Sequence, residues 1–191
     1  MDFGNTFLAE LLAGLSVAVI ATLFVPWYLN WQRIKSGKLY LCFYDRTQTY
    51  KISPTNGGDY ESTFLLTIKN STPFSLRDVQ LNIYLPNTFT TSIEEKVSEY
   101  GDISGGPVPA GYMVACTLKK PIFPRRYYNV PFKIKIKANK NDFGDKSEEN
   151  IYYYFSTEKG VFPRTAEFIN EERSIYVSEF DKLSKLTIKR S

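Results

Sequence analysis

Basic and aromatic side chains alternate in the segment from residue 119 to residue 128, and together they could hold a phosphate group. Guanidinium and ammonium groups satisfy phosphate charge, and aromatic faces stack on nucleotide bases. Arg125 and Arg126 are the strongest candidates, because they lie in a proline-bounded loop where two guanidinium groups can converge. The full set of candidate anion-binding residues is Lys119, Lys120, Arg125, Arg126, Tyr127 and Tyr128.

The charged residues around this segment are all basic, since no Asp or Glu occurs between Ile103 and Asn141. A nucleotide, a nucleic acid or an anionic lipid headgroup would suit such a stretch. A plainer interpretation is that Lys133, Lys135 and Lys137 only keep one face of a strand in water and discourage aggregation. The pattern has no motif-level specificity, so both interpretations stay open.

The composition gives little support for a catalytic site or a metal site. The chain has no His, which removes the commonest general base, the usual Ser-His and Cys-His pairs, and most zinc sites. Its two cysteines, Cys42 and Cys116, both fall in strand patterns typical of small buried hydrophobic residues. No glycine-rich phosphate loop is present. We therefore expect a non-enzymatic protein with no catalytic residues, no metal and no cofactor.

The elements that must position these residues are strands, because apolar side chains recur with a period of two after Lys38. In residues 131–137, for example, Phe132, Ile134 and Ile136 share one face while lysines occupy the other. Gly-, Asn- and Pro-rich turns separate the candidates. The predicted strands are Lys38–Arg46, Gln48–Ile52, Glu61–Lys69, Leu76–Leu85, Tyr112–Leu118, Pro131–Lys137 and Asn150–Ser156.

Strands without intervening helical periods favour an antiparallel β-sandwich or a small barrel. Residues 65–86, LLTIKNSTPFSLRDVQLNIYLP, resemble strand pairs of bacterial immunoglobulin-like sandwiches, and this resemblance implies an immunoglobulin-like arrangement. The long connection Pro86–Gly111 is predicted to hold a short helix near Ile93–Glu99. A C-terminal helix is predicted over Thr165–Leu186, with short strands as the alternative.

An uncharged stretch, Leu11–Gln32, precedes the strands and is long enough to cross a bilayer as a helix. Trp27, Tyr28 and Trp31 lie at one end, where aromatic rings favour the headgroup layer. A cleaved signal peptide is disfavoured, because it would begin with basic residues and have a shorter apolar run.

All 24 basic residues follow this stretch. Because basic residues favour the cytoplasmic side of a membrane, the sequence predicts an N-terminus outside the cell membrane and a cytoplasmic C-terminal domain. Gly14, Ala18 and Thr22 form a stripe of small residues that could pack helices into a homo-oligomer. The predicted organisation is a segment with one transmembrane helix (1–32), a spacer (33–38), a β-sandwich (39–163) and a C-terminal helix or tail (164–191).

The layout predicts a single-pass membrane protein whose cytosolic sandwich senses or docks an anionic ligand, such as a nucleotide or an anionic lipid, or an unknown protein partner. A short membrane segment joined to a β-rich domain also resembles the membrane-disrupting effectors of bacterial nucleotide-signalled antiviral systems. That resemblance implies nucleotide binding near Arg125 and Arg126 followed by clustering of the spans. A third interpretation is a structural subunit of an envelope or secretion assembly.

Overall fold

The computed structural model describes residues 22, 24–28, 38–109, 111–143, 146–166 and 177–191, and the chain divides into two compact units, Met1–Gly37 and Lys38–Ser191. In the first unit, residues 25–28 are α-helical, and the rings of Phe24 and Trp27 pack edge to face with centroids 6.5 Å apart. Trp27 and Tyr28 are exposed.

The predicted transmembrane segment lies largely outside the described residues, which include only Thr22 and 24–28 of the stretch 11–32. Gly14, Ala18 and Trp31 are among the positions that are not described. Within the described part of the chain, no helix combines the length and the apolar character needed to cross a membrane.

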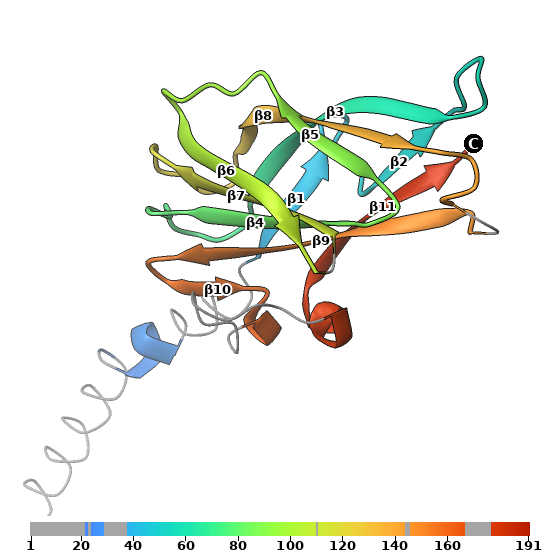
Figure 1. Ribbon diagram of the computed structural model, residues 1–191. Coiled ribbons are helices and arrows are strands. Elements are labelled where there is room, and N and C mark those ends of the chain that lie inside the picture. Colours follow the sequence, from blue (N-terminus) through green and yellow to red (C-terminus); the bar gives the residue numbers. More distant parts are fainter. Residues whose placement is uncertain (1–21, 23, 29–37, 110, 144–145, 167–176) are drawn as a thin grey trace, which may run out of the picture. The chain divides into compact units, whose positions relative to one another are not determined.

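The second unit is a β-sandwich of two sheets, which confirms the mainly-β prediction and excludes the closed barrel (Figure 1). One sheet has four strands in the order β1-β3-β8-β5, and the other runs β2-β11-β9-β4-β7-β6 with β10 paired to β9. The only parallel pair among these described strands joins β11 to β2. The strands are β1 (Leu39–Phe43), β2 (Thr49–Ile52), β3 (Tyr60–Asn70), β4 (Gln80–Pro86), β5 (Thr90–Glu94), β6 (Gly101–Val108), β7 (Gly111–Leu118), β8 (Tyr127–Ala138), β9 (Glu148–Thr157), β10 (Gly160–Phe162) and β11 (Ser184–Arg190).

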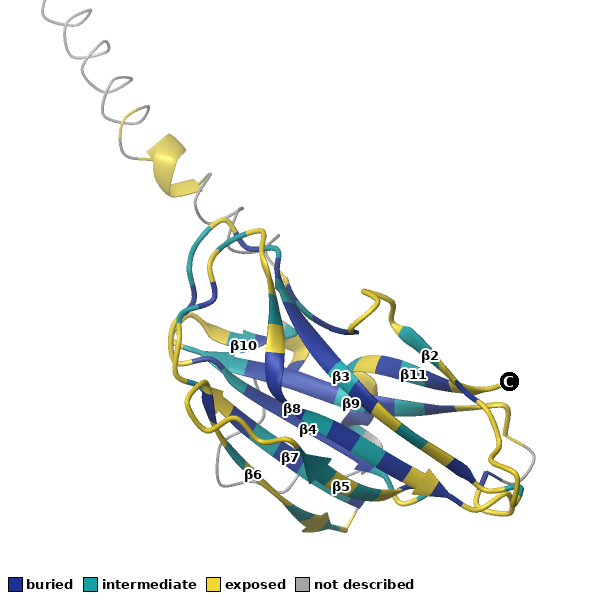
Figure 2. Ribbon diagram, turned by 90° about the horizontal axis from the view of Figure 1, so that it is seen from above, coloured by how far each residue is buried: buried dark blue, intermediate teal, exposed yellow. Residues whose placement is uncertain are grey.

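Alternating side chains from both sheets form the core, as the period-two pattern predicts (Figure 2). Phe132, Ile134 and Ile136 are buried on β8, while the lysines between them reach the other face. Tyr153 of β9 is one of the largest side chains fully buried in this core. Burial raises the pKa of its hydroxyl.

The C-terminal region differs from the predicted helix. The described residues there form two short 3-10 helices, η2 (Arg164–Ala166) and η3 (Val177–Lys182), followed by β11, while residues 167–176 are not described. Because β11 lies between β9 and β2, the sandwich extends beyond the predicted boundary at residue 163. Phe180 and Leu183 cover the outer face of the larger sheet, where they pack against its tyrosines.

The long connection after β4 contains two strands in place of the predicted helix at 93–99. Strand β5 pairs with β8, and β6 pairs with β7 at the edge of the larger sheet. Residues 95–100 join them, and therefore cross from one sheet to the other at the side of the sandwich.

Candidate functional site

The two lysines that begin the predicted anion site both have carboxylate neighbours. Lys119 Nζ lies 2.8 Å from the carboxylate of Asp102 and donates to the carbonyl of Ser98 at 2.9 Å. Lys120 Nζ lies 3.8 Å from the carboxylate of Glu99 and 4.2 Å from the ring centre of Tyr100. Their partners come from β6 and from the 95–100 connection, so the fold offsets part of the positive charge that the sequence segregates.

The lysine row on β8 is neutralised in the same way. Lys135 Nζ lies 2.7 Å from the carboxylate of Glu61 on β3 and 3.7 Å from that of Glu94 on β5. Lys137 also pairs with Glu61, at 3.2 Å. Hydrogen bonds from Lys135 and Lys137 lower the pKa of the Glu61 carboxyl. These lysines keep one strand face in water, which agrees with the plainer of the two interpretations.

Arg125 and Arg126 lie in the turn that leads into β8, and their backbones are fixed to the end of β3. The N–H of Arg125 donates to the carbonyl of Asn70 at 2.7 Å, and the N–H of Asn70 donates to the carbonyl of Arg126 at 3.2 Å. Among the described residues, neither guanidinium group has a hydrogen bond or ion pair. Arg125 adopts a left-handed backbone conformation with φ of 60°.

Asn70 is fully buried and holds this corner of the fold together. Its Nδ2 donates to the carbonyls of Phe74 and Ile122, each at 3.0 Å. Its Oδ1 accepts from the N–H and hydroxyl of Thr72 at 2.8 and 2.6 Å. With every polar atom of the side chain engaged, Asn70 anchors the connection that precedes β8.

The six predicted residues therefore divide among four places. Lys120 and Tyr128 line a pocket at the side of the sandwich, Lys119 pairs with Asp102, and Arg125 and Arg126 remain at the turn. Tyr127 instead lies beneath two cations: Arg46 Cζ is 4.6 Å and Lys69 Nζ is 5.3 Å from its ring centre.

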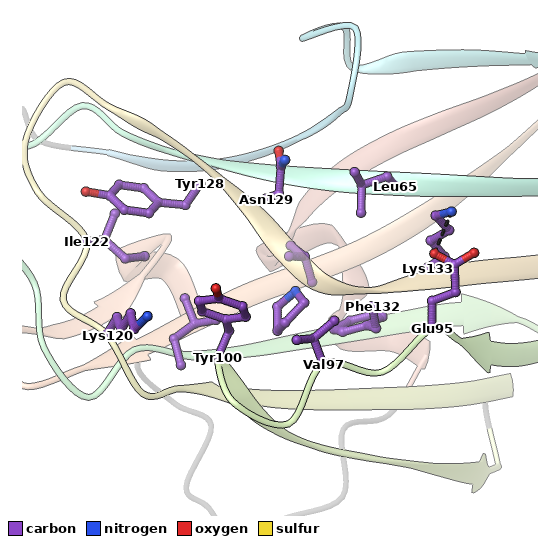
Figure 3. Close-up of a pocket in the computed structure, with 13 residues that line it drawn as sticks. Leu65, Glu95, Val97, Tyr100, Lys120, Ile122, Tyr128, Asn129, Phe132 and Lys133 are labelled. Atoms are coloured by element: carbon purple, nitrogen blue, oxygen red, sulfur yellow. Dashed lines mark ion pairs between the residues drawn. The ribbon is translucent and has the colours of Figure 1, made fainter.

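The side pocket has a volume of about 480 Å³ and opens where β8 lacks a neighbouring strand (Figure 3). Strand β5 pairs only with Lys133–Lys137 of β8, so residues 127–132 have no strand partner on that side. The 95–100 connection crosses this gap, and the Val97 N–H donates to the Pro131 carbonyl at 2.9 Å. The pocket thus results from an edge strand that stops short.

Apolar side chains from five parts of the fold line the pocket, namely β3, β8, the 95–100 connection, the end of β7 and the residues that follow β7. Val97 and Tyr100 are 42% and 45% exposed, so part of this apolar surface meets solvent. The Tyr128 hydroxyl accepts the N–H of Phe123 at 2.7 Å and fixes the connection beside it. The main lining residues are Val97, Tyr100, Leu118, Ile122, Tyr128 and Pro131.

Charged groups occur only at the rim of this pocket. Lys120 is at one end, and the ion pair of Lys133 with Glu95, 2.6 Å long, is at the other (Figure 3). In the part of the chain that the structure describes, no cluster of three His, Cys, Asp or Glu side chains could hold a metal ion. The arrangement suits reversible binding of an apolar group better than acid–base chemistry.

Sequence reasoning missed Val97, Tyr100 and Pro131 as parts of a site. Val97 and Tyr100 fall in the connection Pro86–Gly111, which was predicted to hold a short helix near Ile93–Glu99, and Pro131 was named only as the start of a predicted strand. Exposed apolar residues in a connection were a usable signal, but their convergence depends on the pairing of β5 with β8.

Both cysteines are buried and unpaired with each other, as their strand positions predict. Burial raises the pKa of the Cys116 thiol to about 12 and also raises that of Cys42. Neither thiol is therefore a reactive nucleophile in the folded domain.

Comparison with known proteins gives no family for this chain. No family model matches the sequence, and no curated protein matches it. Among solved structures, an uncharacterized protein from Nocardia farcinica with an immunoglobulin-like fold has 11% identity and a TM-score of 0.45, with 76% of this chain and 99% of that chain covered.

Two further structures show how varied the similar proteins are. A cohesin module of a Clostridium perfringens family 33 glycoside hydrolase has 10% identity and a TM-score of 0.41, covering 81% of this chain and 96% of that one. AvmM, which catalyzes macrocyclization in alchivemycin A biosynthesis, has 10% identity and a TM-score of 0.36, covering 81% and 89%. Binding modules and enzymes both occur, so these similarities assign no activity.

Proposed function

We propose that the sandwich is a non-enzymatic binding module and that the side pocket is its binding site. The observation that carries this proposal is the apolar cavity of about 480 Å³ between Tyr100, Ile122 and Pro131, at the gap that β5 leaves beside β8. Ligand sites in proteins are typically apolar cavities of this size with a few polar groups at the rim.

The rim favours a ligand that joins an apolar part to an acidic group. The Lys120 side chain is 61% exposed, and its partner Glu99 is 3.8 Å away, so it can turn towards a stronger anion. The rings of Tyr100 and Tyr128 offer flat apolar surface next to it. An anionic amphiphile or an acidic residue flanked by apolar side chains in a protein partner has this chemistry.

The proposal includes a membrane tether formed by residues 11–32. Its support is the length of this stretch and the absence of charged residues in it. It would hold the binding module at the cytoplasmic face of the cell membrane, because the basic residues follow the stretch. Alkaline carbonate should then leave the full chain in the membrane pellet, and a C-terminal reporter should be active only in the cytoplasm. Release of the protein into the supernatant would rule out the tether.

The pocket can be tested with 8-anilinonaphthalene-1-sulfonate, whose rings are apolar and whose sulfonate is anionic. Full-length variants would be titrated in identical neutral detergent micelles, so that the micelle signal is common to all. Val97→Trp fills the pocket and should weaken the protein-dependent signal about tenfold, while Lys120→Gln should weaken it severalfold. Thr117→Trp adds the same ring at an exposed position of β7 and serves as the control.

Saturable one-to-one binding that Val97→Trp removes and Thr117→Trp retains would support the proposal. A signal that is identical in all four proteins would overturn it, because binding would then not involve the pocket. Circular dichroism of each variant checks that the sandwich is still folded.

A further inference from the structure

A second group of side chains lies on the face of the four-stranded sheet that points away from the core. Tyr127 on β8 is directly opposite Lys69 on β3, and Arg46 reaches the same ring from the turn after β1. The ring centre of Tyr127 is 4.6 Å from Arg46 Cζ and 5.3 Å from Lys69 Nζ. We name Arg46, Lys69 and Tyr127 the tyrosine–cation cluster.

The two cations of this cluster have no carboxylate partner among the described residues, and their charge is therefore available to an anion. Asp45 is the acidic residue next to Arg46 in the sequence, but its carboxylate binds Thr47 instead. Its Oδ1 accepts the N–H and the hydroxyl of Thr47 at 3.1 and 2.8 Å. Seven described lysines pair with a described carboxylate, namely Lys119, Lys120, Lys133, Lys135, Lys137, Lys146 and Lys189.

The backbone at Arg46 adds a second observation. Its φ is 67°, in the left-handed region that glycine adopts easily and a residue with a Cβ adopts at a cost. The N–H of Arg46 donates to the carbonyl of Phe43 at 2.7 Å, which fixes the tight turn. Glycine would relieve the strain but would remove the guanidinium group. Strained backbone positions cluster at functional sites, and Arg46 shares this φ region with Asp78, Glu95 and Arg125.

Further positive charge lies nearby, because the turn containing Arg125 and Arg126 is hydrogen-bonded to Asn70, the residue after Lys69. No carboxylate of the described residues pairs with these arginines. A hollow of about 480 Å³ is lined by Tyr44 and Asp45, the two residues that precede Arg46 in the chain.

We infer that the tyrosine–cation cluster binds a phosphate-type anion. The Arg46 guanidinium donates to two phosphate oxygens, and the Lys69 ammonium donates to a third. The Tyr127 ring holds both cations in place through their attraction to its face. The same chemistry recognises a soluble phosphate compound and a lipid phosphate headgroup. No residue of the cluster lines the side pocket, so this inference does not depend on the function proposed above.

Calorimetric titration of the full-length chain in neutral detergent micelles would test the inference. Pyrophosphate represents the soluble source, and dihexanoyl phosphatidic acid, a short-chain lipid, represents the headgroup. The decisive variant is Arg46→Gly, which removes the cation while relieving the strained backbone. We expect its unfolding temperature to be unchanged or higher and its anion affinity to fall at least about tenfold.

Matched variants separate the cluster from general surface charge. Lys69→Gln should weaken binding severalfold, and Tyr127→Leu should weaken it while preserving net charge. Lys189→Gln removes one positive charge from β11, where Lys189 pairs with Glu148 at 3.1 Å, and should change the affinity less than about twofold.

Binding of either compound that depends on Arg46 and Lys69 supports the inference, and the tighter compound identifies the source. The inference is wrong if neither compound binds at millimolar concentration. It is equally wrong if Lys189→Gln weakens binding as much as Arg46→Gly, since the attraction would then be nonspecific.

Discussion

The backbone N–H of Val97 donates to the carbonyl of Pro131 at 2.9 Å, just beyond the last pair between β5 and β8, which joins Glu94 to Lys133. This bond attaches the crossing connection to β8 after regular pairing has ended, close to the ion pair between Lys133 and Glu95. The side pocket lies between the connection and the strand.

Replacing Val97 by proline removes this donor and should lower the free energy of unfolding by about 1 kcal/mol. We also expect faster amide hydrogen exchange across residues 95–100, because the connection loses its attachment to β8. Val97→Ala keeps the N–H and is the control for the loss of side-chain contacts. Equal exchange rates in the two variants would show that the hydrogen bond does not hold the connection.

The buried side chain of Asn70 makes a second strong prediction. Asn70→Ala leaves the Phe74 carbonyl and the Thr72 N–H without this partner, and should destabilise the domain by about 2–4 kcal/mol. Chemical denaturation of the full-length protein would measure the change. The neighbouring Ser71→Ala should cost less than about 0.5 kcal/mol, and a similar loss in both variants would contradict a special role for the amide.

The pairing of Glu61 with Lys135 and Lys137 predicts a pH dependence. The pKa of this carboxyl is lower in the folded state, so its contribution to stability is present above the unfolded pKa of about 4.3 and is lost as the pH falls through the folded pKa. Glu61→Gln should therefore be less stable than wild type near pH 7 and equal to it near pH 2.5.

Denaturation midpoints at both pH values, measured with and without added salt, would check this prediction. Glu158→Gln is the control, because Glu158 is exposed and has no ion pair among the described residues. A difference between wild type and Glu61→Gln that persists in acid would show that the carboxylate charge is not the cause.

Because both cysteines are buried, we expect their thiols to be unreactive in the folded protein. At about pH 8 the Cys116 thiol, with its pKa raised to about 12, should remain protonated and should not react with a disulfide reagent in the folded protein. Cys42 is also buried and donates to the carbonyl of Thr67 at 3.3 Å. Both thiols should react after denaturation, whereas rapid reaction without denaturant would reveal local opening around β1 or β7.

The strands that sequence patterns predicted are those with one buried face. On β3, Phe64, Leu66 and Ile68 alternate with partly exposed or polar residues, and this period of two is unambiguous. Strand β6 gives no such signal because it contains Gly105, where a Cβ would lie 2.7 Å from the Cδ1 of Ile93. A side chain at this position would make the end of Ile93 move, and glycine usually argues against a strand.

The helix predicted near the C-terminus rested on the helical spacing of Phe168, Ile169, Tyr176, Phe180 and Leu183, of which the structure describes only the last two. The described residues form η3 and β11 instead, and β11 includes the alternative strand Lys185–Lys189. Phe180 and Leu183 cover the outer face of the larger sheet, whereas Leu186 lies in the central core. A change from 3-10 helix to strand between them produces the same spacing, so periodicity alone could not separate the two possibilities.

The candidate sites were predicted only in part. Lys120, Tyr127 and Tyr128 take part in a pocket or cluster, but their partners Tyr100, Arg46 and Lys69 come from other strands and turns. The acid-free stretch suggested a basic surface because carboxylates such as Glu61, more than 70 positions before Lys135, are not visible as neighbours in a linear sequence.

The inner position of β11 has a consequence for synthesis. Its residues, Ser184–Arg190, fill the space between β9 and β2, whose sequences emerge from the ribosome earlier. Until translation has passed Arg190, those two strands have unpaired backbone groups that can recruit foreign strands. We therefore expect nascent copies of this chain to be prone to association with one another until β11 has been synthesised.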